Sequence, residues 1–114
     1  MGLFGSKPSV ELLKARGDVR GLIKALRNRD PGTREKAAES LGLMDDPRAV
    51  DPLIAALKDK DELVRLSAVN ALGDLGHPKA KEPLTKMLSD EYAGVREKAS
   101  DALARIAKRT GERT

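Results

Sequence analysis

The chain repeats itself with a period of 31 residues, and this periodicity restricts its possible folds more than any other feature. When residues 30–60 are placed over residues 61–91 without a gap, 11 of the 31 positions carry identical residues. A chain of similar short units is typical of a solenoid, in which each unit packs only on its neighbours. In the first unit the identical positions are Asp30, Arg34, Ala37, Leu41, Gly42, Pro47, Ala49, Pro52, Leu53, Leu57 and Asp59.

The first half of each unit predicts a helix that begins after an aspartate. Asp30 and Asp61 can accept hydrogen bonds from the free amides of a first helical turn, and Pro31 has no amide to lose there. Gly42 and Gly73 recur inside these helices, where a glycine costs about 1 kcal/mol relative to alanine. We therefore expect neighbouring helices to make a close contact at the two glycines.

The second half of each unit predicts a helix with two prolines. Pro47 and Pro78 are the last residues of the turns DDP and GHP, and we expect them at the first helical position, where no amide is needed. Pro52 and Pro83 come five residues later. There the missing amide should bend the opening turn. A helix that starts afresh at Asp51 is the alternative.

Apolar residues recur every three or four positions and give each helix one apolar stripe. Neither helix of a unit can bury its stripe alone, so stability has to come from stacking. The last second-type helix has a weaker stripe, because Lys81 and Thr85 replace apolar residues, and Tyr92 stands where an aspartate would cap, with Ser89 or Asp90 as alternative caps. The stripes are Val64, Ala68, Leu72 and Leu75 in a first helix and Val50, Leu53, Ile54 and Leu57 in a second helix.

The repeat divides the 114 residues into four parts. Residues 1–29 form an N-terminal lid and a half repeat, 30–60 and 61–91 are complete repeats, and 92–114 are a capping half repeat with a tail. The core has to be filled by Leu, Ile, Val and Ala, because aromatic residues make up 2% of the sequence. We predict an all-α fold, a short right-handed α-solenoid of about seven helices.

The unit resembles the short HEAT-like repeats found in relatives of phycobilisome lyases. The resemblance covers nearly the whole chain after about residue 18, and it implies stacked helix pairs but no single function. In this family the arginine matched by Arg34, Arg65 and Arg96 makes structural contacts within and between repeats. The motif DxxVRxxAxxALGxLGxPxAxxPLxxxL is carried by Asp61, Val64, Arg65, Ala68, Ala71, Leu72, Gly73, Leu75, Gly76, Pro78, Ala80, Pro83, Leu84 and Leu88.

Residues able to carry chemistry are few. The sequence has no Cys and one His, and His77 sits in a turn where the preceding repeat has Asp46, so we expect a turn residue rather than a ligand or base. One enzymatic branch of the family, deoxyhypusine hydroxylase, binds two irons through repeated His-Glu pairs, and no HE dipeptide occurs here. We therefore expect no metal or cofactor, and we predict that the chain is not an enzyme.

The N-terminal sequence MGLFGSKPS bears on localisation. It lacks a long apolar run, and although MGLFGS fits the loose pattern for N-myristoylation, no second membrane signal accompanies it. The absence of Cys favours a reducing compartment. We expect a cytoplasmic protein that binds no membrane, as a monomer or weak homo-oligomer. The regular repeat and the many charged residues also fit a thermophile protein or a consensus design.

Charge along the chain indicates where a partner binds. The four parts carry net charges of +5, −2, −2 and +3, a distribution that disfavours one continuous nucleic-acid track. The outward positions of the second helices vary between repeats, whereas the packing positions do not. We expect these outward positions to line a concave face. They are Arg20, Lys24, Arg27, Asp51, Ala55, Lys58, Glu82, Lys86 and Ser89.

These observations favour a noncatalytic interaction module or scaffold. Its concave face would bind a protein partner with an acidic element near Arg20, Lys24 and Arg27. A nucleic-acid-associated protein that uses its basic ends is the alternative, supported by a pI of about 9.5. A third possibility is an accessory subunit of a lyase-type or cofactor-modifying enzyme.

Overall fold

A computed structural model describes residues 8–111, and the MGLFGS sequence lies outside this range. The described chain is all-helical, which confirms the predicted fold class, and none of its helices is long and apolar enough to cross a membrane. Between residues 8 and 111, three short 3-10 helices, labelled η, accompany seven α-helices. In order they are α1 (Val10–Ala15), α2 (Val19–Ala25), α3 (Pro31–Leu43), η1 (Pro47–Ala49), α4 (Val50–Ala56), α5 (Glu62–Leu75), η2 (Pro78–Ala80), α6 (Lys81–Lys86), η3 (Met87–Ser89) and α7 (Ala93–Thr110).

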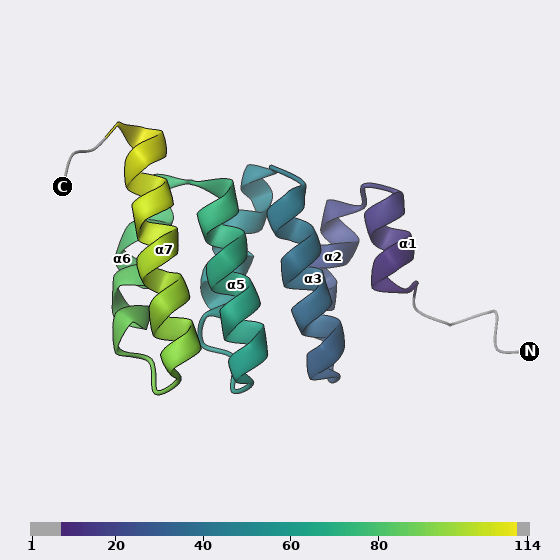
Figure 1. Ribbon diagram of the computed structural model, residues 1–114. Coiled ribbons are helices and arrows are strands. Elements are labelled where there is room, and N and C mark those ends of the chain that lie inside the picture. The colour runs from purple at the N-terminus through teal and green to yellow at the C-terminus, as the bar shows by residue number, and fades with distance from the viewer. Residues whose placement is uncertain (1–7, 112–114) are drawn as a thin grey trace, which may run out of the picture.

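The helices form an elongated array of 57 × 28 × 16 Å. The first helices of the units, α3, α5 and α7, stand side by side, and α1 and α7 lie at opposite ends of the array (Figure 1). The second helices form the other row, where α2 packs on α3, α4 on α5 and α6 on α7. Each second helix thus packs on the first helix that follows it in the chain.

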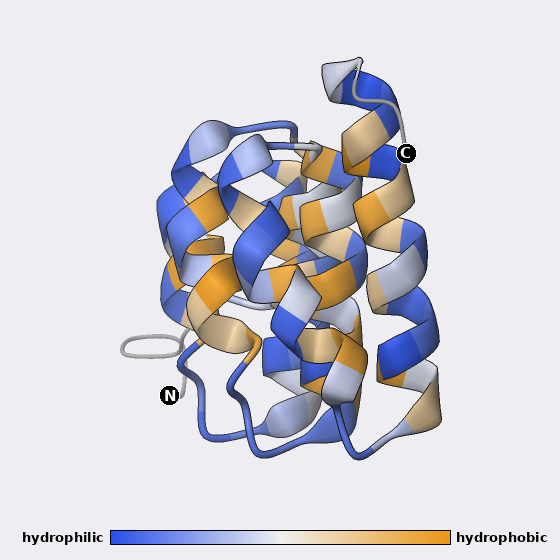
Figure 2. Ribbon diagram, turned by 90° about the vertical axis from the view of Figure 1, so that its left-hand side faces the viewer, coloured by the Kyte–Doolittle hydropathy of each residue, from blue (hydrophilic) through white to orange (hydrophobic). Residues whose placement is uncertain are grey.

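Leucines from both rows fill the space between them. Leu22, Leu53 and Leu84 of the second helices and Leu41 and Leu72 of the first helices have no exposed surface. Figure 2 shows the pattern behind this, with hydrophobic and hydrophilic residues alternating along each helix and mainly hydrophilic loops at the helix ends. The predicted stripes therefore face the core, where burial of a large aliphatic side chain contributes about 1.5–3 kcal/mol.

Aspartates begin the first helices as predicted. Asp30 accepts a hydrogen bond from the amide of Thr33 at 3.0 Å, and Asp61 accepts from Leu63 and Val64. At α7 the expectation of a substitute cap is wrong, because Tyr92 is the N-cap residue and makes no capping hydrogen bond through its side chain.

The two prolines of each second helix divide it into two parts. Pro47 and Pro78 open the 3-10 helices η1 and η2, as expected for a first helical position. Pro52 and Pro83 are the third residues of α4 and α6. The alternative start at Asp51 is wrong, because α4 begins one residue earlier. The recurrent bend is a change from 3-10 to α-helix ahead of the second proline.

The recurrent glycines lie where first helices touch. A Cβ atom on Gly42 would lie 2.8 Å from the Cα atom of Ala71 in α5, and one on Gly73 would lie 2.9 Å from the Cβ atom of Ala102 in α7. The contact of Gly42 involves backbone, which cannot move away as a flexible side chain can. Glycine is therefore required at this position by the spacing between α3 and α5.

Replacement of Gly42 by alanine should destabilise the protein, although alanine is the better helix former. Overpacking costs about 1–3 kcal/mol and the helix gains about 1 kcal/mol, so we expect a net loss of up to about 2 kcal/mol in the free energy of unfolding. Urea denaturation followed by circular dichroism measures this change. Gly94→Ala is the matched control, because nothing lies within 4 Å of the added atom. Equal effects of the two substitutions would show that the α3–α5 contact does not require glycine.

Candidate protein-binding surface

Nine residues predicted from the sequence make up what we call the second-helix face. All nine are exposed, and they lie opposite the buried leucines of α2, α4 and α6. Arg27 and Lys58 follow the ends of α2 and α4, and Ser89 belongs to η3. The structure therefore places them at the surface, while their role in binding stays a prediction. The second-helix face is Arg20, Lys24, Arg27, Asp51, Ala55, Lys58, Glu82, Lys86 and Ser89.

Ion pairing differs between the α4 part and the α2 part of the second-helix face. Asp51 on α4 forms an ion pair with Lys79, with 2.8 Å between Oδ1 and Nζ. Around α2, in contrast, Arg20, Lys24 and Arg27 form no ion pair with any residue between 8 and 111. The α2 end of the face thus offers three cations whose charge other described residues do not neutralise.

A groove of about 380 Å³ separates α4 from α6 on the same face. Ile54, Leu57 and Met87 supply apolar surface, while Lys58 and Lys86 supply charge. This arrangement suits a segment that buries an apolar side chain and places an acidic one beside it. The other lining residues are Lys79, Glu82 and Pro83.

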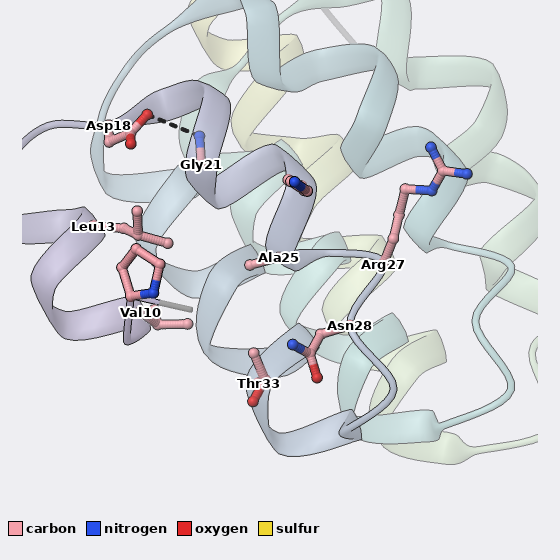
Figure 3. A pocket seen from close by; sticks show the side chains of 10 residues that line it. Val10, Leu13, Asp18, Gly21, Ala25, Arg27, Asn28 and Thr33 are labelled. Atoms are coloured by element: carbon pink, nitrogen blue, oxygen red, sulfur yellow. Dashed lines mark hydrogen bonds between the residues drawn. The ribbon is translucent and has the colours of Figure 1, made fainter. Parts of the chain in front are cut away.

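A second pocket, of about 390 Å³, lies between α1 and α2. Figure 3 shows Val10 and Leu13 of α1 gathered beside Gly21 and Ala25 of α2, while the side chain of Arg27 extends away from this apolar group. Lys24 also lines the pocket. The two pockets together bring in five of the nine residues of the second-helix face, while Arg20, Asp51, Ala55 and Ser89 line neither pocket.

The α1–α2 contact explains why the first second-type helix has Gly21 where the later repeats have Pro52 and Pro83. The amide of Gly21 donates to Oδ1 of Asp18 at 2.8 Å, and a proline has no amide to donate. A Cβ atom at this position would also lie 2.6 Å from Cδ2 of Leu13. Glycine thus supplies both a donor and the space that α1 occupies.

Two of the repeated arginines join a first helix to the loop that leads into the next first helix. Arg34 donates through Nε to Oδ2 of Asp59 at 2.8 Å and through Nη2 to Oδ1 at 3.0 Å. Arg65 binds Asp90 in the same way at 2.9 and 3.2 Å. We call these two bidentate pairs the arginine ladder. The side chains of Arg65 and Asp90 are 9% and 8% exposed, so water screens the pair little.

A signal for the ladder is present in the repeat, although the motif alone does not reveal it. The arginines were expected to make structural contacts, but their carboxylate partners were not predicted. Asp59 and Asp90 are identical at equivalent positions, 25 residues after Arg34 and Arg65. Arg65 also lies under the ring of Tyr92, with 5.5 Å from its guanidinium carbon to the ring centroid.

The ladder holds its carboxylates in the ionised form. Burial by itself raises the pKa of Asp59, but the hydrogen bonds from Arg34 and from the amide of Asp61 outweigh it and leave the pKa below the ordinary value of 3.8. The pKa of Asp90 is lowered by the same balance, with Arg65 and the amide of Tyr92 as donors.

His77 caps a 3-10 helix. Its Nδ1 accepts a hydrogen bond from the amide of Lys79 at 3.1 Å and so caps η2, as Oδ1 of Asp46 caps η1 through the amide of Arg48. This agrees with the expected turn residue and adds the capping role. Within residues 8–111 no three His, Cys, Asp or Glu side chains are grouped so that they could hold a metal ion.

The comparisons with known proteins agree with this architecture. A family model described as HEAT repeats matches residues 19–104, and no curated protein matches the sequence. Among solved structures, human deoxyhypusine hydroxylase in complex with glycerol is similar, with 27% sequence identity and a TM-score of 0.79. The similarity covers 92% of this chain and 39% of that chain.

This similarity corrects one expectation from the sequence. The prediction that the chain is not an enzyme is contradicted, because a solved structure with the same helical arrangement is that of an enzyme. The prediction rested on the missing His-Glu pairs and the single histidine. The chain spans about two fifths of the length of the hydroxylase chain.

Removal of Arg65 should destabilise the protein strongly. Arg65→Met keeps the bulk of the side chain but leaves Asp90 buried without its partner, so we expect the free energy of unfolding to fall by about 3 kcal/mol or more. Arg96→Met is the control at the equivalent exposed position and should change it by less than about 1 kcal/mol. Urea denaturation compares the two variants. Similar losses would mean that the carboxylate partner contributes little.

The ladder also predicts how stability depends on acid. Because the pKa of Asp59 and Asp90 lies below 3.8 in the folded state, both carboxyl groups bind protons more weakly when folded than when unfolded. Their stabilising effect is complete above about pH 5 and is lost as the pH falls through the folded pKa. An Asp59→Asn, Asp90→Asn double variant should be less stable at neutral pH and lose less between pH 5 and 2. Parallel stability curves for the two proteins would contradict this.

Proposed function

The chain belongs to the HEAT-repeat family, and from this premise we propose that it binds a protein partner through the second-helix face. The observation that carries the proposal is a contrast within the repeat. Several positions that pack or pair, including Arg34 and Leu53, are identical in the two units, while the three exposed positions Asp51, Ala55 and Lys58 of the first unit all differ in the second. A surface that need not be the same in every unit is free to fit a partner.

The chemistry of the face describes the partner. Arg20, Lys24 and Arg27 at the α2 end attract an acidic element, since no described residue neutralises them by an ion pair. The α4–α6 groove adds an apolar floor with Lys58 and Lys86 beside it. The partner segment therefore carries acidic residues and at least one apolar side chain that enters the groove.

The proposal concerns binding and applies to either of two settings. The similar hydroxylase structure supports the idea that a set of helices like this one can be part of an enzyme. The second-helix face would then hold a protein next to a catalytic site. In an accessory subunit of an enzyme, the second-helix face would likewise hold a protein next to the catalytic site.

Reversal of the charge around α2 tests the proposal. We expect the Arg20→Glu, Lys24→Glu, Arg27→Glu variant to lose partner binding, because the change replaces attraction to acidic residues by repulsion. Circular dichroism and melting should stay unchanged, since all three side chains are exposed. A Lys60→Glu, Lys98→Glu, Lys108→Glu variant has the same net charge and alters exposed lysines outside the second-helix face, so it should still bind.

A photo-cross-linking amino acid in place of Ala55 identifies the partner for this comparison. Ala55 is exposed in the middle of the face, and cross-linked proteins from the native cell extract are identified by mass spectrometry. Capture of the same partner by the variant changed around α2 would refute the proposed surface. Binding to duplex DNA or RNA that weakens steeply with salt would favour the nucleic-acid alternative instead.

A further inference from the structure

Each ladder arginine has two binding edges. One edge holds the loop before its own helix, since Nη1 of Arg34 donates to the carbonyl of Asn28 and Nη1 of Arg65 to that of Asp59, both at 2.8 Å. The other edge, Nε with Nη2, holds the carboxylate at the end of the same unit, in the loop that leads into the next first helix. The first contact orients the guanidinium so that the second edge faces the neighbouring loop.

Arg96 has the first contact without the second. Its Nη1 donates to the carbonyl of Asp90 at 2.7 Å, as in the two earlier repeats. No carboxylate of residues 8–111 lies within ion-pair distance of its guanidinium. The side chain is exposed, whereas Arg34 and Arg65 are 8% and 7% exposed. The Nε–Nη2 edge, which binds a carboxylate in Arg34 and in Arg65, is therefore oriented in Arg96 and accessible to a partner.

Apolar surface accompanies this open edge at the α6–α7 end of the array. Leu88 is 40% exposed, although its equivalents Leu57 and Leu26 are 4% and 7% exposed. Tyr92, which precedes α7, is 45% exposed. The last described unit thus leaves uncovered both the ladder position and a leucine that the earlier units bury, which is the composition of a small docking surface.

A second copy of the chain is a poor occupant for this surface. At the opposite end of the array Asn28 stands where the inner units have Asp59 and Asp90, so a stacked copy would offer no carboxylate to Arg96. Residues 1–29 and 92–114 also carry net charges of +5 and +3, and contact between the two ends would bring like charges together.

We propose that the α6–α7 end, which carries Arg96 and the exposed Leu88 and Tyr92, binds an acidic loop of a partner protein. The loop presents one aspartate to Nε and Nη2 of Arg96, as Asp59 and Asp90 do to Arg34 and Arg65. A carboxylate fits both N–H groups in one plane, and such bidentate pairs are stronger than single hydrogen bonds. Glu97 does not oppose this, because Glu35 stands next to Arg34 in the same way where the pair forms.

This surface is separate from the second-helix face, and its test is independent of that proposal. The probe is the peptide KDKDEL, which has the sequence of residues 58–63 and contains Asp59, the ladder aspartate. It is titrated into the full chain while the Nε–Hε signals of the arginines are followed by NMR. The peptide with Asp59→Asn is the matched control, and inorganic phosphate tests a general anion site.

We expect saturable movement of the Arg96 signal, no change at Arg34 or Arg65, and about tenfold weaker binding of the Asn peptide. An Arg96→Gln chain should bind both peptides equally weakly, while the variant with three glutamates around α2 should bind like the unchanged chain. The proposal is overturned if the Arg96 signal does not move, if the Asn peptide binds equally well, or if phosphate binds Arg96 as tightly as KDKDEL.

Discussion

The bidentate pair between the arginine of a first helix and the aspartate of the loop that leads into the next first helix is the interaction on which the rest of the architecture depends. Hydrophobic burial brings the helices together, but it has no direction and would tolerate several positions of one unit on another. The Arg34–Asp59 and Arg65–Asp90 pairs fix that position, because two hydrogen bonds in one plane allow little sliding. Each arginine also holds the loop before its own helix, so a single side chain sets both the start of a helix and the place of the following unit.

Close packing of small residues is the second constraint, and it acts with the ladder. Gly42 allows α3 to approach the backbone of α5, and Ala102 faces Gly73 where α5 meets α7. The ladder joins the same units through their loops. With the spacing between first helices fixed at both places, the second helices can be short and can begin in a 3-10 turn. The exposed residues of the second helices then do not contribute to packing and can differ between units.

Much of this could be predicted from the sequence, because the repeat shows which residues recur and elementary chemistry explains why. The helices, the caps at Asp30 and Asp61, the close contact at Gly42 and the position of Pro47 all follow from local rules. The partners of the arginines do not, since 25 residues separate Arg34 from Asp59 and only the fold brings them together. The start of α4 at Val50 was missed because a 3-10 turn accommodates Pro47 without ending the helical path. The pockets beside α2 and between α4 and α6 depend on helix spacing, which no local pattern contains.

Tyr92 gives this protein a spectroscopic property that follows from its place over Arg65. It is the only tyrosine and the sequence has no tryptophan, so near-ultraviolet emission comes almost entirely from one ring. That ring lies where the last ladder pair joins α5 to the loop before α7. Its signal therefore reports on the closing of the final unit, while far-ultraviolet circular dichroism reports on all helices together. Comparison of the two signals during denaturation would distinguish a solenoid that opens from this end from one that unfolds as a single body.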